Sequence, residues 1–144
     1  GKKYFKKLVI FRPHNIYGEK MGKDHVVPDL IEKLKKLKGK KFKIQGTGNE
    51  IRSFCHIDDF IRGFDVLIKR GKHLNIYNIG SSQKVKIKDL ALKMAKIYNK
   101  KIILVKSPIS KGSTKIRVPD ITKLKKLGFK PKLNIDKGLR KAMN

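Results

Sequence analysis

The amino-acid sequence predicts an α/β fold built as a single domain over residues 1–144. Short apolar runs rich in β-branched residues alternate with segments whose apolar residues recur at three- and four-residue steps. The first pattern is typical of strands and the second of amphipathic helices, so their alternation indicates α/β construction. The strands are too few and too irregularly ordered for a complete nucleotide-binding sheet. We therefore expect a small mixed sheet with flanking helices.

The individual elements follow from the same patterns. Residues 8–11 are typical of a buried strand, and Pro13, Asn15 and Gly18 indicate an irregular loop after it. Further strands are expected at 42–45, 51–57, 74–79 and 102–105, and the turn residues 46–49 allow the first two of these to form a hairpin. Helices are expected from Asp24 or His25 to Lys38, from an N-cap at Asp58 or Asp59 to Gly71, and at 89–98, 121–127 and 136–143.

The net charge of +27 raises the hypothesis of a nucleic-acid-binding module. Only six of the 38 basic residues are arginine, however, and the lysines are spread along the whole chain. Base edges and phosphates favour the planar guanidinium, whereas lysine acts as a diffuse point charge. A solvated basic surface is therefore favoured, and a basic nucleic-acid-binding module is kept as the alternative.

Simple features disfavour several other classes of protein. No apolar stretch approaches the roughly 20 residues of a membrane span. The single cysteine, Cys55, excludes an internal disulfide and fits a reducing cytoplasm. Cys55 and His56 are neighbours on an expected strand and point to opposite faces, and the His and Cys residues follow no zinc-ligand spacing. Asp58–Asp59 is favoured as a helix cap over a catalytic pair. We expect a cytoplasmic protein with neither a metal site nor catalytic residues in this chain.

Four short motifs occur in order along the chain. Residues 12–18 read R-P-H-N-I-Y-G directly after the first expected strand. Residues 46–59 contain G-x-G-x-x-x-R-x-F followed by H-I-D-D, and residues 77–80 read Y-N-I-G. Residues 117–123 read R-V-P-D-I-T-K and precede L-G-F-K-P at 127–131. Each motif is weak alone, but the four together, in one order and at similar spacing, are specific.

With these motifs the chain resembles the extended short-chain dehydrogenase/reductase family of NAD-dependent epimerases and dehydratases that act on nucleotide sugars. The resemblance runs from Leu8 almost to the C-terminus. It implies the C-terminal, substrate-binding part of a Rossmann-type enzyme. The family's glycine-rich turn G-x-x-G-x-x-G and its catalytic pair Y-x-x-x-K are absent from this sequence. The resemblance thus implies a truncated portion, inactive alone, of a parent enzyme that uses NAD and forms a homodimer. A non-catalytic nucleotide-binding remnant remains the other interpretation.

The predicted partner is a nucleoside-diphosphate sugar, whose pyrophosphate has two negative charges. Arg52 and Arg117 come from separate segments and could clamp it with charge-assisted, forked hydrogen bonds. Both arginines could instead be ordinary partners of surface salt bridges. The resemblance further implies that Pro13 and His14 lie near the cofactor. It places six more residues around the nucleotide: Asn15, Val27, Pro28, Lys43, Gln45 and Asn78.

Overall fold

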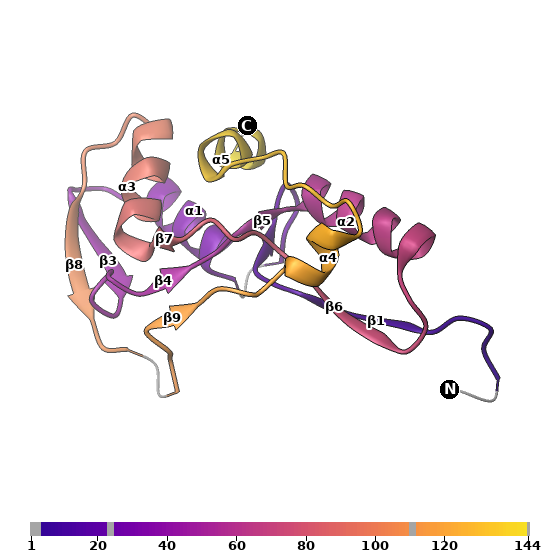
Figure 1. Ribbon diagram of the computed structural model, residues 1–144. Coiled ribbons are helices and arrows are strands. Elements are labelled where there is room, and N and C mark those ends of the chain that lie inside the picture. Colours follow the sequence, from indigo (N-terminus) through magenta and orange to yellow (C-terminus); the bar gives the residue numbers. More distant parts are fainter. Residues whose placement is uncertain (1–3, 23–24, 110–111, 144) are drawn as a thin grey trace.

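The computed structural model describes residues 4–22, 25–109 and 112–143, and it confirms the α/β class (Figure 1). The strands are β1 (Val9–Pro13), β2 (Ile16–Tyr17), β3 (Lys41–Gln45), β4 (Ile51–Arg52), β5 (Cys55–His56), β6 (Asn75–Ile79), β7 (Val85–Lys86), β8 (Ile103–Ser107) and β9 (Ile116–Arg117). The helices are α1 (Val26–Lys36), α2 (Ile57–Arg70), α3 (Ile87–Ile97), α4 (Thr122–Lys126) and α5 (Ile135–Met143).

The strands of the described residues form four small sheets instead of one mixed sheet. Three of these sheets are parallel pairs, β1–β6, β2–β5 and β3–β8. In the fourth sheet β4 lies between β7, to which it is antiparallel, and β9, to which it is parallel. The predicted hairpin between residues 42–45 and 51–57 is therefore wrong. Gly46 and Gly48 have φ of 77° and 82°, and they turn the chain out of the β3–β8 sheet so that β4 joins a different one.

The buried apolar residues form two clusters. The larger cluster lies among α1, α3, α5 and β3, and it includes Leu34, Leu90, Met94 and Leu139, none of which is exposed. The smaller cluster lies among α2, α4 and β6. Figure 1 shows the two parts side by side, with β1 and β6 extending away from the α1–α3 part. Tyr17 of β2 and Val85 of β7 belong to the larger cluster.

Strand β1 is exposed, although its sequence is typical of a buried strand. Its side chains after Val9 are exposed, with Ile10 at 44% and Phe11 at 38% of their accessible area. Among the described residues only β6 pairs with it, and its Phe11 ring packs against Phe60 and Phe64 of α2. Within the same residues, no helix is both long enough and apolar enough to cross a membrane.

Candidate functional site

Arg52 and Arg117 lie side by side on parallel strands. β4 and β9 pair in the register Ile51 with Ile116 and Arg52 with Arg117, so the two arginines are direct neighbours across the sheet. Like charges in this arrangement repel each other. Burial and the neighbouring Arg117 charge both hold the pKa of Arg52 below its ordinary value. Neither arginine forms an ion pair with a carboxylate of the described residues. The salt-bridge interpretation therefore finds no partner there.

Arg52 is fixed in place by neutral groups. Its guanidinium donates to the carbonyl oxygen of Ile51 at 2.8 Å and reaches the Ser113 hydroxyl at 3.3 Å. Each guanidinium has five donors. Arg52 also donates to the carbonyl oxygen of Lys115 at 3.5 Å, and the acceptors of the described residues leave donors of both arginines for a ligand. Two adjacent cations, neither in an ion pair with a carboxylate of the described residues, make a site that an anion would stabilise.

A groove connects these arginines to most of the residues predicted from the sequence. It consists of three adjoining hollows, and Val26 at the start of α1 lines all three. The first, of about 210 Å³, is lined by Asn15, Tyr17, Val27 and Arg117 among others. The second, of about 90 Å³, includes Gln45, Glu50 and Arg52. The third, of about 570 Å³, includes His25, Lys43, Gln45 and Ser107.

The start of helix α1 faces this groove. Its N-cap residue His25 makes no side-chain capping hydrogen bond, so within the part of the chain that the structure describes His25 leaves the N–H groups of the first turn uncapped. Pro28, in the same turn, has no N–H group. Uncapped donors at a helix N-terminus, together with the helix dipole, favour an anion. This feature and the two arginines therefore favour the same kind of ligand.

Asn15 lies at the arginine end of the groove in an unusual conformation. Its φ is 45°, in the left-handed region, and its side-chain amide donates to the carbonyl oxygen of Ser53 at 2.8 Å. Its own carbonyl accepts from the backbone N–H of Cys55 at 3.1 Å. These two bonds hold the loop before β2 against β5, so Asn15 borders the hollow as part of a rigid wall.

Three of the predicted residues lie together elsewhere, at the end of the β1–β6 sheet. The Asn78 side-chain oxygen Oδ1 accepts from His14 Nε2 at 3.1 Å, and its amide nitrogen donates to the carbonyl oxygen of Asp120 at 2.8 Å. Pro13 is the exposed last residue of β1. Asn78 thus connects the loop after β1 to the segment before α4. Pro28 is half-buried within α1 and does not line the three hollows.

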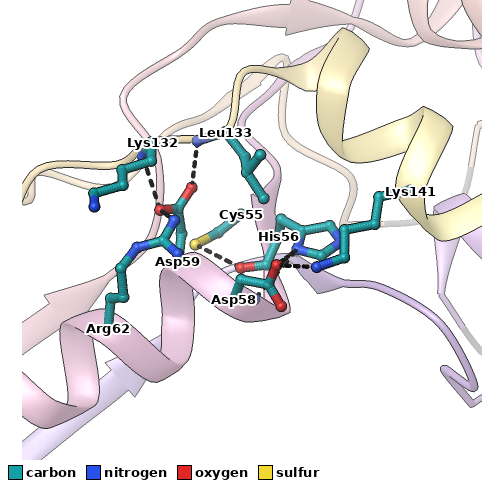
Figure 2. Close-up of polar contacts among 8 residues, drawn as sticks. All are labelled: Cys55, His56, Asp58, Asp59, Arg62, Lys132, Leu133 and Lys141. Atoms are coloured by element: carbon teal, nitrogen blue, oxygen red, sulfur yellow. Dashed lines mark hydrogen bonds and ion pairs between the residues drawn. The ribbon is translucent and has the colours of Figure 1, made fainter.

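The two carboxylates Asp58 and Asp59 are not the N-cap of α2. The N-cap is His56, whose Nδ1 accepts from the backbone N–H of Asp58 at 3.2 Å. Asp59 is 1% exposed and accepts from the backbone N–H groups of Lys132 and Leu133, at 2.8 and 2.9 Å (Figure 2). The predicted cap was wrong: Asp59 binds the segment before α5 instead, and Asp58 pairs with Lys141 within α5.

Further contacts in Figure 2 were missed by the sequence analysis. Asp59 also pairs with Arg62, and Asp58 pairs with Lys141 of α5 at 2.6 Å. Asp59 and Arg62 are three residues apart on α2, a spacing at which helical side chains meet. Asp58 and Lys141 are far apart in sequence and follow no motif, so no local signal could have identified that pair. Cys55 is buried, and burial raises the pKa of its thiol to about 12, which makes it a poor nucleophile. The described residues contain no group of three or more His, Cys, Asp or Glu that could hold a metal ion.

Residues 1–80 match the model of the NAD dependent epimerase/dehydratase family. The chain belongs to this family. It is 37% identical over 90 residues to a dTDP-D-glucose 4,6-dehydratase of Dictyostelium discoideum, a match that covers 62% of the chain and 20% of that protein. It is 28% identical over its full length to a trifunctional enzyme of Arabidopsis thaliana whose first activity is that of a UDP-glucose 4,6-dehydratase, and it covers 22% of that enzyme.

Solved structures agree with this membership. The UDP-glucuronic acid 4-epimerase of Bacillus cereus, in complex with UDP-glucuronic acid and NAD, superposes with a TM-score of 0.85 at 28% identity. The UDP-glucose 4-epimerase of Thermotoga maritima, solved with UDP-glucose, gives a TM-score of 0.86 at 26% identity. Both matches cover 99% of the chain but 46% of the epimerase. The chain therefore spans less than half the length of these relatives.

Proposed function

We propose that this chain is the substrate-binding portion of an NAD-dependent nucleotide-sugar epimerase or dehydratase, and that it binds the nucleoside diphosphate. The observation that carries the proposal is the in-register pair of Arg52 and Arg117, which lies near the start of α1, whose N-cap residue His25 makes no side-chain capping bond. A pyrophosphate placed there would relieve the repulsion between two guanidinium groups and accept hydrogen bonds from both.

The rest of the groove supports a ligand larger than a diphosphate. Gln45 borders both the hollow of Arg52 and the wider hollow of Lys43, so the groove continues from the arginines along β3. We assign the nucleoside to this wider end. Related epimerases that superpose on nearly the whole chain were solved with UDP-glucuronic acid or UDP-glucose. Asn15 and Val27 would border the diphosphate. Asn78 would affect nucleotide binding indirectly, because its hydrogen bonds hold His14 and the segment at Asp120 in place.

We further propose that the cofactor-binding and catalytic residues belong to another part of the enzyme. The chain lacks the G-x-x-G-x-x-G turn and the Y-x-x-x-K pair. Pro13 and His14 are the two residues that the family resemblance places near NAD, and a ring nitrogen of His14 is hydrogen-bonded to Asn78. These residues do not make a dinucleotide site, so no step of hydride transfer is assigned to them.

The exposed β1–β6 sheet supports the same division. Parallel sheets are normally covered on both faces. Here Ile10 and Phe11 of β1 are exposed, and so are Ile61 and Ile68 on α2, at 57% and 60%. An apolar parallel sheet of this kind would be covered if another part of the enzyme packed against it.

Isothermal titration of the chain with UDP and dTDP tests the binding proposal. We expect Arg117→Ala to weaken binding about ten- to hundredfold, because a hydrogen bond to a charged group is worth roughly 1.5–3 kcal/mol. Arg140→Ala, which removes an exposed arginine of α5 outside the groove, is the matched control. An equal loss for Arg140 or for single lysines would reduce the site to generic anion attraction.

The same variants separate the alternative functions. A nucleic-acid-binding module predicts binding to duplex or single-stranded DNA with a steep salt dependence and little effect of Arg52 or Arg117 specifically. A non-catalytic nucleotide-binding protein predicts UDP binding by the chain without any partner half. Reconstituted epimerase or dehydratase activity with a cofactor-binding half would exclude that reading.

A further inference from the structure

The turn at residues 46–50 determines how the two ends of the groove lie relative to each other. The arginines at one end belong to the β7–β4–β9 sheet, whereas Lys43, Gln45 and Ser107 at the other end belong to the β3–β8 sheet. The shortest chain connection between the two sheets is this turn, which runs from the end of β3 to the start of β4 (Figure 1), and a longer one runs from β8 to β9. A ligand that contacts both ends therefore depends on the geometry of the turn.

The side chain of Glu50 holds this turn from inside. Its residue is only 8% exposed. One carboxylate oxygen accepts from the backbone N–H and the hydroxyl of Thr47, both at 3.0 Å, and the other accepts from the backbone N–H of Gly48 at 2.9 Å. Gly46 and Gly48 both have positive φ, a conformation that costs glycine little and that these three bonds stabilise.

The turn is also attached to the start of α3. The carbonyl oxygens of Glu50 and Gly48 accept from the backbone N–H groups of Ile87 and Lys88, at 3.1 and 2.9 Å. These are donors of the first helical turn, which have no partner within the helix. A side chain on Gly48 would meet Lys88 and Ile44, because a Cβ there would lie 2.6 Å from the Ile44 Cδ1. The turn thus has one well-defined conformation.

Glu50 remains ionised in this environment. Burial acts to raise its pKa, but the hydrogen bonds from Thr47 and Gly48 outweigh burial, and the pKa lies below the ordinary carboxyl value. The carboxylate also favours the charged form of Arg52, opposite in sign to the effect of Arg117. It borders the same hollow as Arg52 and Gln45.

We infer that Glu50 is a positioning residue that sets the spacing between the diphosphate end and the nucleoside end of the groove. This inference rests on the proposed function. Glu50 acts by holding the turn. The inference requires no contact between Glu50 and the ligand. It follows that a change at Glu50 affects ligands that bridge both ends more than ligands that occupy the arginine end alone.

The test compares the affinities of UDP and inorganic pyrophosphate for the chain and its variants. UDP reaches both ends, whereas pyrophosphate reaches only Arg52 and Arg117. We expect Glu50→Gln to weaken UDP about tenfold and pyrophosphate less than about twofold, because the turn loses a carboxylate acceptor while both arginines remain. Asp65→Asn, which removes an exposed carboxylate of α2, is the matched control and should change neither affinity.

Two further variants protect the test against a failure of Glu50→Gln to fold. Thr47→Val removes one hydroxyl bond to Glu50 from an exposed residue and should lower the ratio of UDP to pyrophosphate affinity by a smaller factor. Gly48→Ala disturbs the turn without changing a charge and should lower it as Glu50→Gln does.

The outcomes distinguish the two proposals. If Glu50→Gln weakens UDP and pyrophosphate equally, Glu50 has only a structural role and the inference is wrong. If Glu50→Gln changes neither affinity, Glu50 has no role in binding and the inference is also wrong. Equal affinity of the unsubstituted chain for UDP and pyrophosphate would also overturn the inference, since the nucleoside end would then contribute nothing. If the unsubstituted chain binds neither compound, the proposed function itself fails and the inference fails with it.

Discussion

Substitution of Gly138 by alanine should destabilise the chain, although alanine is the better helix former. Gly138 is buried in α5, where a Cβ would overlap the hydroxyl of Tyr17 and lie 2.9 Å from its ring carbon Cζ. Tyr17 is 2% exposed, and its ring stands edge-on to that of His56 at a centroid distance of 5.4 Å. Because the ring is rigid and enclosed, the alanine must displace either α5 or Tyr17, which lines the groove.

The magnitude follows from two opposing effects. Glycine to alanine within a helix gains roughly 0.5–1 kcal/mol. Overpacking of a close-packed interior costs roughly 1–3 kcal/mol, and the overlap with a rigid ring places this case at the upper end. We expect a net loss of about 1–2 kcal/mol in the free energy of unfolding. For a domain of this size that is a fall in Tm of about 2–8 °C.

Urea unfolding followed by circular dichroism measures this loss. Gly39→Ala is the matched control, because nothing lies within 4 Å of a Cβ built there. Tyr17→Phe combined with Gly138→Ala should recover part of the loss, since it removes the overlapping hydroxyl. If Gly138→Ala is as stable as the Gly39 variant, the reasoning that α5 packs tightly beneath the groove is refuted.

Three other substitutions test contacts that hold the site in place. Burial holds the pKa of His56 below its ordinary value of 6.5, so the unfolded chain binds the proton at a higher pH than the folded chain does. The free energy of unfolding should therefore be constant well above pH 6.5 and should fall as the pH drops below 6.5. His56→Asn should flatten this slope in urea midpoints measured between pH 5 and 8, and an unchanged slope would contradict the assignment. Lys100→Met removes the ammonium donor to the last carbonyl oxygens of α1 and should cost about 1 kcal/mol in thermal unfolding, with Lys101→Met as a neutral control. Asp59→Asn should cost about 2–3 kcal/mol and speed proteolysis of residues 130–143, unlike Asp65→Asn, because two backbone N–H groups lose their carboxylate.

The helices could be predicted from the sequence because their signal is local. The helix expected from Asp24 or His25 to Lys38 is observed as Val26–Lys36, and the one expected at 136–143 is observed as Ile135–Met143. Apolar spacing reports which face a helix buries. It does not report which strands pair. β3 and β8 are joined in register Phe42 with Leu104, and nothing in either short segment identifies the other.

The site was predictable in its residues but not in its geometry. Arginine at positions 52 and 117 stands out in a chain dominated by lysine, and the motifs bring both to attention. That Arg52 and Arg117 are paired across β4 and β9 depends on how the strands pair, which the short sequence segments do not specify. The role of Glu50 could not be predicted either, because Glu50 occupies one of the three variable positions before the arginine of the G-x-G-x-x-x-R motif. The motif specifies no residue type there. The one local sign of this role in the sequence is an acidic residue that closely follows two glycines, Gly46 and Gly48.

The charge of the chain and the specificity of its groove are separate properties. Most of the cationic side chains that the structure describes lie on the surface, where salt screens them and where exposed ion pairs are worth little. Together they attract any anion and would hasten the arrival of a nucleotide sugar. Arg52 differs because it is partly buried, fixed by the Ile51 carbonyl oxygen, adjacent to a second guanidinium, and attached to a turn that Glu50 holds. High salt should therefore slow UDP association strongly while leaving the ratio between UDP and pyrophosphate affinities nearly unchanged. A ratio that collapsed with salt would mean that surface lysines, and not this pair, select the ligand.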